Sequence, residues 1–508
     1  MTNLPDWLEP LPDAAQQRAL DEWAIDELGI PGLELMDRAG HGLAELVLQR
    51  ASEGPIAVVC GKGNNGGDGF VAARLLREHG LDVRVLVLAP TEEYRGDARD
   101  NLERLLGPPP EPFTADRLTG MRAIVDAILG TGFAGTPREP AAGAIEAINR
   151  AGAAHVIACD MPSGVNGSTG EIEAAAVRAD ATATFHAAKP GLWIAPGKAH
   201  AGEVTVVDIG IPAGGPAHPD VGLITPAVLD EIPRRGREST KFAAGSVLVC
   251  GGSTGLTGAP CMAAESAMRA GAGYVTALVP ASLHPIFESR LLEVMTVPLA
   301  DEAGSLTTEA AGQVGERLVR ADALVLGPGF GRADGALEAA RRIAATAERP
   351  LLLDADGLNA HAGALETLAG RPAATVLTPH AGELARLLGT NSDAVSARRL
   401  ESAREAARRA QAIVVLKGDD TLIAHPDGRV AVSRGGAAAL ATAGTGDVLS
   451  GVIGALLAKA MDPFHAACAG VFVHASAGRL AEREIGAEGV IASDVIERLP
   501  AALQGQGY

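Results

Sequence analysis

The sequence predicts an α/β protein of two domains, residues 1–215 and 225–508, each built on a largely parallel sheet covered by helices. Three observations carry this prediction. Short apolar runs alternate with helical patterns in two long stretches, which is typical of βα units. A chain of 508 residues is too long for one ordinary hydrophobic core. The proline-rich segment Ile211–Pro219 separates the two stretches and is polar enough to be a linker.

The first stretch opens with helical apolar patterns, over Ala14–Leu28 and from Leu33 onward. Continuous apolar runs then predict buried parallel strands. These strands are expected at 56–60, 82–88, 123–128, 155–159, 181–185 and 204–207.

The second stretch begins again with a strand after a surface connection over Glu231–Thr240. Its strands are expected at 246–250, 274–279, 322–326, 350–353, 374–377 and 412–416. A Pro-Asp-Gly turn then predicts a hairpin over Thr421–Val432. A charged helix is expected over Ala394–Ala410, and helices close the chain.

Composition and charge exclude several classes of protein. The net charge of −19 without a long basic run argues against nucleic acid and anionic membranes as partners. We find no apolar run long enough to span a bilayer and no signal peptide at the N-terminus. The five cysteines are scattered and form no C-x-x-C pair, which favours a reducing cytoplasm over disulfides or a cysteine zinc site.

The segment Cys60–Gly69 is the most informative motif of the chain. It holds five glycines between a predicted strand and a helix expected from Phe70. Glycines in such a turn let backbone N–H groups approach a ligand, and Asn64, Asn65 and Asp68 add polar side chains. The segment matches neither the dinucleotide G-x-G-x-x-G pattern nor the P-loop. The alternative is a tight turn without a ligand.

Two more motifs follow predicted strands of the first domain, Asp126–Thr136 and Cys159–Gly164. Because ligands of open α/β sheets bind at the carboxyl ends of the strands, we expect Asp126 and Asp160 to face one crevice. Two carboxylates in one pocket suit acid–base chemistry or cation binding, with Asn65, Asp126 and Ser163 as oxygen ligands. A simple capping role is the alternative for Asp126 alone.

These first-domain motifs, together with Leu35–Gly40, resemble the YjeF N-terminal domain, an NAD(P)H-hydrate epimerase with a Rossmann-like three-layer fold. The resemblance covers about residues 10 to 215 and implies that Asn65, Asp126 and Ser163 bind potassium. It also implies that Asp160 is catalytic; we expect its carboxylate to move a proton and to stabilise positive charge on the substrate ring. The residues implied to bind the hydrated nucleotide are Asn64, Asn65, Gly66, Gly67, Asp68, Gly130, Thr131, Gly132, Phe133, Ala134, Gly135, Thr136 and Asp160.

The strongest motif of the second domain is Thr442–Gly451, which opens an apolar helix. Gly444 and Gly446 free the first backbone amides of this helix to hold an anion, and Asp447 in the first turn is placed to take a proton from an attacking hydroxyl. Plain N-terminal capping is the alternative. Further motifs at predicted strand ends favour a nucleotide site: Gly327–Gly331, Asp354–Asn359, Thr378–Glu383 and Lys417–Thr421.

The order of these motifs resembles the ribokinase-like superfamily, and most of all its ADP-dependent NAD(P)H-hydrate dehydratase branch, over roughly residues 225 to 505. Sugar and vitamin kinases of this superfamily usually have Asn-x-x-Glu where this chain has His380-Ala-Gly-Glu383, which favours the dehydratase branch. The resemblance implies that Lys417, Gly418, Asp419, Asp420, Thr421 and Gly446 bind ADP or AMP, and that Ala259, Gly329, His380 and Asp447 bind the hydrated cofactor. Asp447 is implied to be the base, with Glu383 organising Mg²⁺ through water.

Together the two resemblances imply a bifunctional enzyme that epimerises hydrated NADH and NADPH and dehydrates the S form with ADP, giving AMP and phosphate. Potassium would serve the first domain and magnesium the second. Small molecules are the expected partners, and a cytoplasmic homo-oligomer is expected. Two alternatives remain at this point: a vitamin or sugar kinase with an appended nucleotide-binding domain, and a first domain that binds ligand without turnover.

Overall fold

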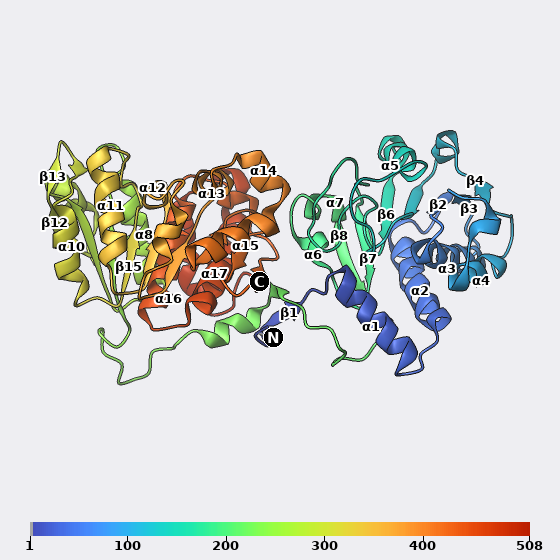
Figure 1. Cartoon of the computed structure of the whole chain (residues 1–508), viewed down its shortest axis with the longest axis horizontal. Helices are drawn as coiled ribbons and strands as arrows, with labels where there is room; N and C mark the ends of the chain where they lie inside the picture. Colours follow the sequence, from blue (N-terminus) through green and yellow to red (C-terminus); the bar gives the residue numbers. More distant parts are fainter. Residues whose placement is uncertain (1–3) are drawn as a thin grey trace. The chain divides into compact units, whose positions relative to one another are not determined.

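The computed structural model describes residues 4–508 and divides the chain into two compact units. The first unit spans Pro10–Gly222; the second spans Leu223–Tyr508 and also includes Leu4–Glu9 from the start of the chain. Figure 1 shows both units as sheets flanked by helices, which confirms the predicted α/β class. Within residues 4–508, no helix is both long and apolar enough to span a membrane.

The first unit contains a seven-stranded sheet in the order β4-β3-β2-β5-β6-β7-β8, and its neighbouring strands are all parallel. The strands are β2 (Ile56–Cys60), β3 (Val83–Val87), β4 (Glu111–Pro112), β5 (Ala123–Ala127), β6 (His155–Cys159), β7 (Ala181–Phe185) and β8 (Glu203–Val207). The chain runs outward from β2 to β4 and then restarts at β5 on the other side of β2. The strand order therefore reverses between β2 and β5, where Cys60 pairs with Ala127, and such a switch point opens a crevice for a ligand.

Helices cover both faces of this first sheet. Alternate residues of the strands, such as Val58 and Val125, pack in one apolar cluster with α2 (Gly32–Arg50) and α3 (Asn64–Glu78). The intervening residues, such as Val59 and Ile124, pack against α5 (Ala141–Arg150). Shorter helices complete the unit: α1 (Ala14–Asp26), α4 (Gly96–Glu103), α6 (Pro190–Trp193) and α7 (Lys198–Ala201).

The second unit is built on an eleven-stranded mixed sheet in the order β1-β9-β20-β19-β18-β17-β16-β15-β10-β11-β12. Strands β12 to β18 of this order run parallel, and the predicted hairpin adds β19 and β20 antiparallel. The strands are β1 (Leu8–Pro10), β9 (Val221–Ile224), β10 (Ser246–Cys250), β11 (Tyr274–Pro280), β12 (Met295–Leu299), β15 (Ala323–Leu326), β16 (Leu351–Leu353), β17 (Thr375–Leu377), β18 (Ile413–Leu416), β19 (Leu422–Ala424) and β20 (Val430–Val432).

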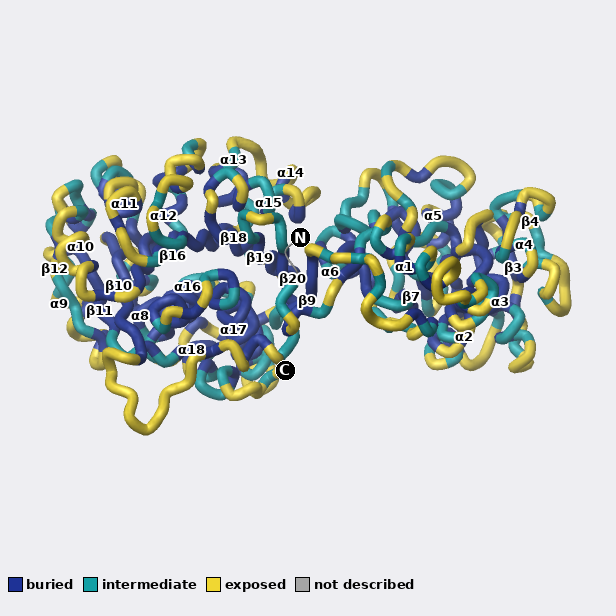
Figure 2. Tube along the Cα trace, turned by 60° about the horizontal axis from the view of Figure 1, so that its bottom comes forward, coloured by how far each residue is buried: buried dark blue, intermediate teal, exposed yellow. Residues whose placement is uncertain are grey.

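One face of the second sheet is covered by four helices whose buried residues form a single large core with the strands. They are α8 (Gly258–Arg269), α16 (Thr445–Ala458), α17 (Pro463–Ile485) and α18 (Ala492–Ala502). Figure 2 shows these helices on one side of the strands and α11 (Asp334–Thr346), α12 (Ala355–Asn359), α13 (Ala381–Leu388) and α15 (Arg399–Ala410) on the other. Helix α16 is buried along most of its length because it is apolar on nearly all sides.

The segment Leu4–Glu9 belongs to the second unit although it precedes the first in sequence. The Trp7 side chain is buried, and its ring lies 5.1 Å from that of His465 and 6.2 Å from that of Phe464 on α17. The Thr225 hydroxyl donates to the Trp7 carbonyl oxygen (2.7 Å), and Glu9 forms an ion pair with Arg434. The first unit is thus an insertion between two segments of the second.

Two predicted helices differ from those observed. The helix expected over 394–410 is divided into α14 (Ser392–Ala397) and α15, because Arg398 leaves the helical conformation at φ −133°. Helix α3 begins at Asn64 rather than near Phe70, so the segment expected to be a glycine turn forms the first turns of this helix.

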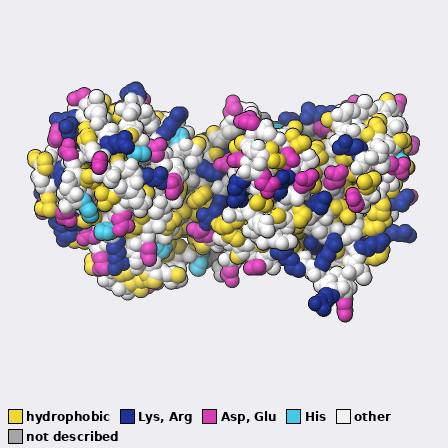
Figure 3. All heavy atoms as spheres, turned by 180° about the vertical axis from the view of Figure 1, so that it is seen from behind, with side chains coloured by type: hydrophobic (Ala, Val, Ile, Leu, Met, Phe, Trp, Pro, Cys, Tyr) yellow, Lys and Arg dark blue, Asp and Glu magenta, His cyan; other side chains and the backbone are white. Residues whose placement is uncertain are grey.

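Charged side chains of both signs are interspersed on one face of the molecule. On the face shown in Figure 3, Lys and Arg side chains lie among Asp and Glu side chains over both units. Several ion pairs join residues one turn apart on the same helix, such as Arg99 with Glu103 on α4 and Arg150 with Glu146 on α5. All five cysteines are buried free thiols, three of them at the ends of β2, β6 and β10.

Candidate active sites

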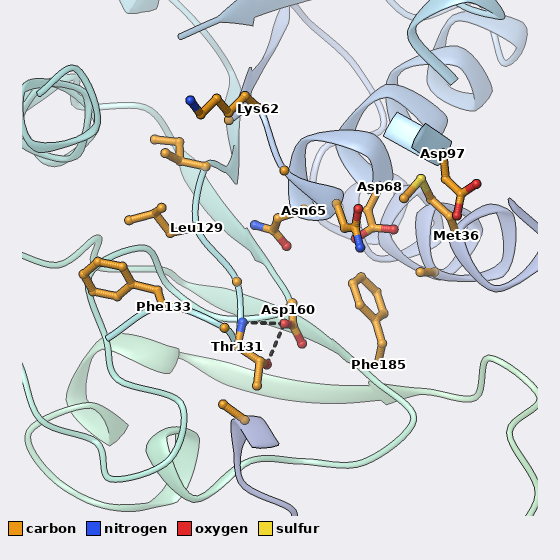
Figure 4. A pocket seen from close by; sticks show the side chains of 18 of the residues that line it. Met36, Lys62, Asn65, Asp68, Asp97, Leu129, Thr131, Phe133, Asp160 and Phe185 are labelled. Carbon is orange, nitrogen blue, oxygen red and sulfur yellow. Dashed lines mark hydrogen bonds between the residues drawn. The ribbon is translucent and has the colours of Figure 1, made fainter. Parts of the chain in front are cut away.

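The first unit holds a cavity of about 1080 Å³ at the switch point between β2 and β5. It is lined by residues from α1, α2 and α3 and from the segments that follow β2, β5, β6 and β7. Most predicted nucleotide-binding positions of the first domain line it: Asn64, Asn65, Asp68, Gly130, Thr131, Gly132, Phe133 and Asp160. Figure 4 shows Asn65, Thr131 and Asp160 near the middle of this cavity, with Lys62 and Phe133 toward one end and Asp68 and Asp97 toward the other.

The remaining predicted positions lie apart from the main cavity. Ala134, Gly135 and Thr136 line a separate hollow of about 400 Å³ together with Leu129 and Phe133. Gly66 and Gly67 are buried inside α3. A Cβ atom at Gly66 would lie 1.9 Å from the Gly61 carbonyl oxygen, so this glycine permits the close packing of α3 against the segment after β2.

Asp160 occupies the end of β6, and four donors surround its carboxylate. The backbone N–H and the hydroxyl of Thr131 donate to Oδ2 at 2.7 and 2.6 Å. The Lys189 ammonium donates to Oδ1 at 2.9 Å, and the Thr184 hydroxyl lies 3.3 Å from the same oxygen. Burial alone would raise the pKa of Asp160, but Lys189 and the Thr131 hydrogen bonds lower it below its usual value. Asp160 is therefore held as a carboxylate.

Gly130 shapes the floor beside this carboxylate. A Cβ atom at this position would lie 2.9 Å from Asp160 Oδ2 and 3.0 Å from Asn65 Oδ1. Only glycine lets the segment after β5 approach both side chains so closely.

Lys189 was missed by the sequence analysis. It follows β7 and is 1% exposed, and its ammonium donates to Asp160, to the Thr184 hydroxyl and to the Phe185 carbonyl oxygen, each at 2.9 Å. Its position could have been found, because a lysine four residues after a predicted strand lies at the same sheet edge as Asp160.

Asp126 does not face the cavity, contrary to the expectation that it would share the crevice with Asp160. It is fully buried in β5, and Ser163 donates to it twice, from the hydroxyl at 2.6 Å and from the backbone N–H at 2.8 Å. Burial raises the pKa of Asp126 to about 6 even though these hydrogen bonds oppose the shift. Asn65, the third predicted cation ligand, is also buried, and its Nδ2 has no hydrogen-bond partner in the described chain.

In the second unit, the predicted anion site lies at the start of α16. Gly444 caps the helix with φ +94°, a left-handed conformation that favours glycine. A Cβ atom at Gly446 would lie 3.5 Å from Lys417 Nζ, so the lysine ammonium lies beside the first turn of the helix. An ammonium group next to free helix amides suits a phosphoryl group.

Three neighbouring strands deliver the charged groups around this helix start. Asp354 follows β16, Glu383 lies on α13 after β17, and Lys417 follows β18. Lys417 Nζ lies 3.0 Å from Asp354 Oδ1 and 3.7 Å from Glu383 Oε2, and the Ser450 hydroxyl donates to Asp354 Oδ2 at 2.7 Å. Burial would lower the pKa of Lys417, but the Asp354 and Glu383 carboxylates raise it, so the lysine stays charged. The sequence analysis placed Asp354 and Ser450 within motifs but gave neither residue a role of its own.

Asp447 lies in the first turn of α16, as predicted, and no hydrogen bond within residues 4–508 reaches its carboxylate. Burial and the nearby Asp354 carboxylate raise its pKa to about 7, with Lys417 opposing the shift. A carboxyl group of this pKa is suited to take up a proton near neutral pH.

The other predicted positions of the second unit lie at the same sheet edge. His380 caps α13: its Nδ1 accepts from the Gly382 N–H at 3.0 Å, and its own backbone N–H donates to Glu383 Oε2 at 2.9 Å. Ala259 and Gly329 are adjacent, since a Cβ atom at Gly329 would lie 3.3 Å from that of Ala259.

The predicted nucleotide segment Lys417–Thr421 forms a tight turn, in which the Thr421 hydroxyl donates to the Gly418 carbonyl oxygen at 2.6 Å. Gly418 and Asp419 are exposed on this turn. Asp420 is instead buried, and Arg399 donates to it at 2.8 Å. This buried ion pair stabilises the turn.

Comparison with known families agrees with this two-site arrangement. Residues 247–501 match the family described as NAD(P)H-hydrate dehydratase, and residues 32–191 match the family described as YjeF-related protein N-terminus. The bifunctional NAD(P)H-hydrate repair enzyme Nnr of Moorella thermoacetica is 40% identical, over 97% of this chain and 96% of its own. The enzyme of the same description from Salinibacter ruber is 37% identical, over 97% of this chain and 95% of its own.

Among solved structures, the ADP/ATP-dependent NAD(P)H-hydrate dehydratase of Bacillus subtilis, co-crystallised with ATP and Mg²⁺, is similar to part of the chain. It is 29% identical, covers 55% of this chain and 95% of its own, and gives a TM-score of 0.47. The two curated relatives match this chain over nearly the whole of both lengths, across both units. The chain belongs to the family of bifunctional NAD(P)H-hydrate repair enzymes.

Proposed function

We propose that the first unit interconverts the R and S forms of hydrated NADH and NADPH, and that the second unit dehydrates the S form at the expense of ADP. The observation that carries this function is the 40% identity to a bifunctional repair enzyme over 97% of the chain. The two activities support each other, since the epimerase supplies the one form that the dehydratase accepts. The kinase and ligand-binding scaffold alternatives are set aside on the same observation.

In the first unit, we propose that the cavity at the switch point binds the hydrated nucleotide. Its volume of about 1080 Å³ is ample for a dinucleotide, because pockets for drug-sized ligands span about 300–1,000 Å³. The backbone of Gly130–Thr136 and the side chains of Asn64, Asn65 and Asp68 are its proposed contacts. Asp160 would lie beside the ring and balance positive charge that develops there.

Potassium is proposed to bind near Asn65, Asp126 and Ser163. The residues fit such an ion, because they offer carboxylate, hydroxyl and amide oxygens, the ligands that hard cations prefer. The groups that donate to the buried Asp126 carboxylate are all neutral: the backbone N–H groups of Ile128 and Ser163 and the Ser163 hydroxyl. Potassium would supply positive charge beside this buried carboxylate and fix the segments after β5 and β6.

In the second unit, we propose that Asp447 removes the proton of the ring C6 hydroxyl. The hydroxyl oxygen then attacks the terminal phosphorus of ADP, and AMP leaves. The ring nitrogen expels the new phosphate by breaking the C6–O bond, and loss of a C5 proton restores the reduced nicotinamide. Phosphorylation matters because phosphate is a far better leaving group than hydroxide.

The groups around Asp447 fit this sequence of steps. Lys417 and the first amides of α16 would hold the transferred phosphoryl group, and the turn Lys417–Thr421 with Gly446 would contact ADP or AMP. Ala259, Gly329 and His380 are the proposed contacts to the hydrated ring. The Glu383 carboxylate suits Mg²⁺ through water, which would supply positive charge beside the phosphoryl group.

We further propose that residues 1–215 carry the epimerase and residues 225–508 the dehydratase, the latter completed by Leu4–Glu9. A cytoplasmic setting is proposed because all five cysteines are free thiols. A homo-oligomer is also proposed; Leu292 and Val319, 86% and 72% exposed, are apolar candidates for such a contact. Size-exclusion chromatography with light scattering tests the oligomer.

The function is tested by the return of reduced-nicotinamide absorbance. The chain is incubated with hydrated NADH as mixed epimers, ADP and Mg²⁺, and both epimers are expected to disappear with formation of NADH and AMP. Omitting ADP or chelating Mg²⁺ should stop NADH formation while the epimers still interconvert. Formation of a lasting phosphorylated product, without NADH, would contradict the dehydratase function.

A further inference from the structure

The cavity of the first unit holds two carboxylates in opposite surroundings. The Asp160 carboxylate accepts four hydrogen bonds: two from Thr131, one from Thr184 and one from Lys189. A carboxylate with a full set of donors, one of them an ammonium group, gains little by accepting a proton. Asp160 is thus built to stay ionised.

Asp68 lies in the same cavity without such partners. It comes from the second turn of α3, is 7% exposed and lines the cavity. Figure 4 shows its side chain beside Phe185, on the far side of Asn65 from the Thr131 segment. No hydrogen bond or ion pair in the described part of the chain reaches its carboxylate, so its oxygens are open to a bound molecule.

The electrostatic surroundings of Asp68 favour its protonated form, as does its lack of hydrogen-bond donors among residues 4–508. Burial raises the pKa of Asp68 well above its usual value, and the carboxylates of Asp160 and Asp21 raise it further. Lys189 opposes this shift but is bonded to Asp160. A pair of carboxyl groups whose pKa values are pushed apart in one pocket is the arrangement that separates an acid from an ionised partner.

We propose that Asp68 exchanges the proton of the epimerase reaction and that Asp160 stays ionised as the counter-charge. This inference rests on the proposed epimerase function and revises the expectation that Asp160 moves the proton. Asp68 is thereby a catalytic residue, and Lys189 is a positioning residue that acts through Asp160.

The step balances as follows. Asp68 gives its proton to the C6 hydroxyl oxygen, the C6–O bond breaks with its electron pair on oxygen, and water leaves. The ring nitrogen's lone pair forms the N1=C6 bond, and the resulting cation lies beside the Asp160 carboxylate. Water then adds to either face of the planar cation and returns a proton to Asp68, directly or through a second water.

The test compares Asp68→Asn with the unaltered chain on hydrated NADH prepared as one epimer. Asparagine keeps the size and polarity of the side chain but cannot donate this proton. The interconversion rate, followed by chromatography of the two epimers, is expected to fall by about 100-fold or more, the usual contribution of one acid–base group. The dissociation constant for hydrated NADH, measured by calorimetry, is expected to change by less than about 3-fold. The matched control Asp37→Asn, on the outer surface and paired with Arg74, should match the unaltered chain in both measurements.

Three results would overturn the inference or its basis, and they differ. An unaltered chain that does not interconvert the epimers removes the epimerase function itself. An active Asp68→Asn variant removes only the assignment to Asp68. An Asp68→Asn variant whose affinity falls as far as its rate shows that Asp68 binds substrate and does not transfer the proton.

If Asp68→Asn does not fold, the pH profile of the unaltered chain decides. The protonated Asp68 is the donor, so the rate is expected to fall as pH rises through its raised pKa. A rate that does not fall with rising pH anywhere in the range where the chain stays folded overturns the inference. The titratable and charged groups that face Asp68 from the surrounding elements are Asp21 on α1, Asp97 on α4, Cys60 on β2, Cys159 on β6, and Asp160 and Lys189.

Discussion

Asp160 of the first unit and Asp447 of the second are both aspartates placed by the carboxyl edge of a sheet, yet their surroundings differ. Asp160 accepts from four donors, including a buried ammonium group, and its pKa is lowered. Asp447 accepts from none within residues 4–508, and its pKa is raised to about 7. Position at a strand end or helix start therefore does not by itself define an acid's role. The donors around it do: one carboxylate is kept charged, and the other is free to take a proton.

The largest expected effect comes from removing the free carboxylate. Asp447→Asn should lower ADP-dependent dehydration by about 1,000-fold, within the range for loss of a general base, because the variant lacks the carboxylate proposed to deprotonate the ring hydroxyl. Epimer interconversion should be unchanged. NADH absorbance and epimer chromatography on one sample measure both activities. Full dehydratase activity in this variant would remove Asp447 from the mechanism.

Next in size is the loss of the buried ammonium group. Lys189→Met keeps the length of the side chain but leaves the Asp160 charge buried without its cation, which typically costs about 3–5 kcal/mol of unfolding free energy. Denaturant unfolding monitored at neutral pH is expected to show this loss, and epimerisation to slow by about 100-fold. Asp160 should also titrate at a higher pH than in the unaltered chain.

A control distinguishes loss of charge from loss of packing. Lys198 lies on α7 of the same unit, outside the cavity lining, and Lys198→Met should leave epimerisation unchanged. Equal losses in the two variants would contradict a specific role for Lys189.

The two activities should depend differently on pH. Asp447 must be deprotonated to act as a base, so dehydration by the unaltered chain should fall about tenfold for each pH unit below about 7. Asp160 carries a lowered pKa and stays charged over the same interval, so it contributes no such decline to epimerisation. Initial rates between about pH 5 and pH 8 measure this. A dehydration rate that does not change over that interval would mean that Asp447 is already ionised at pH 5.

Two glycine substitutions give the smallest effects and differ between the units. A methyl group at Gly130 would press on Asp160 and Asn65, so Gly130→Ala should slow epimerisation by about tenfold and lower the melting temperature by a few degrees. At Gly446 the nearest atom is Lys417 Nζ at 3.5 Å, an ordinary contact, so Gly446→Ala should keep its melting temperature. A higher KM for ADP in Gly446→Ala would then report a phosphoryl group beside the helix start. An unchanged KM would place ADP elsewhere.

The strands could be predicted from the sequence because they are buried on both faces and therefore read as continuous apolar runs. Every strand expected in the first stretch is present, and so is the hairpin of the second. The edge strands β1, β4 and β12 were missed, and so was β9 beside β1, since short strands at or near a sheet edge carry little apolar pattern. The start of α3 was misplaced because glycine normally ends helices, whereas here Gly66, Gly67 and Gly69 are needed for close packing.

For the candidate sites, the sequence indicated the loops that form them but not which residues contact Asp160 and Asp447. Asp160 and Asp447 were found from their motifs, and the structure places both where several strand ends meet. The predicted strand ends place Lys189 and Asp354 at the sheet edges of the two sites, but their contacts with Asp160 and with α16 depend on strand order, which local patterns do not contain. The burial of Asp126 was likewise hidden, since a polar residue near the end of an apolar run is equally compatible with facing solvent or facing Ser163.

The anchoring of Trp7 against α17 has a consequence for how the protein is made. Leu4–Glu9 leave the ribosome before the first unit, but the helix that receives them is synthesised more than four hundred residues later. The second unit is therefore completed only after the first unit has emerged. Deletion of Leu4–Glu9 should disturb the melting of the second unit, even though the first unit is the nearest neighbour of this segment along the chain.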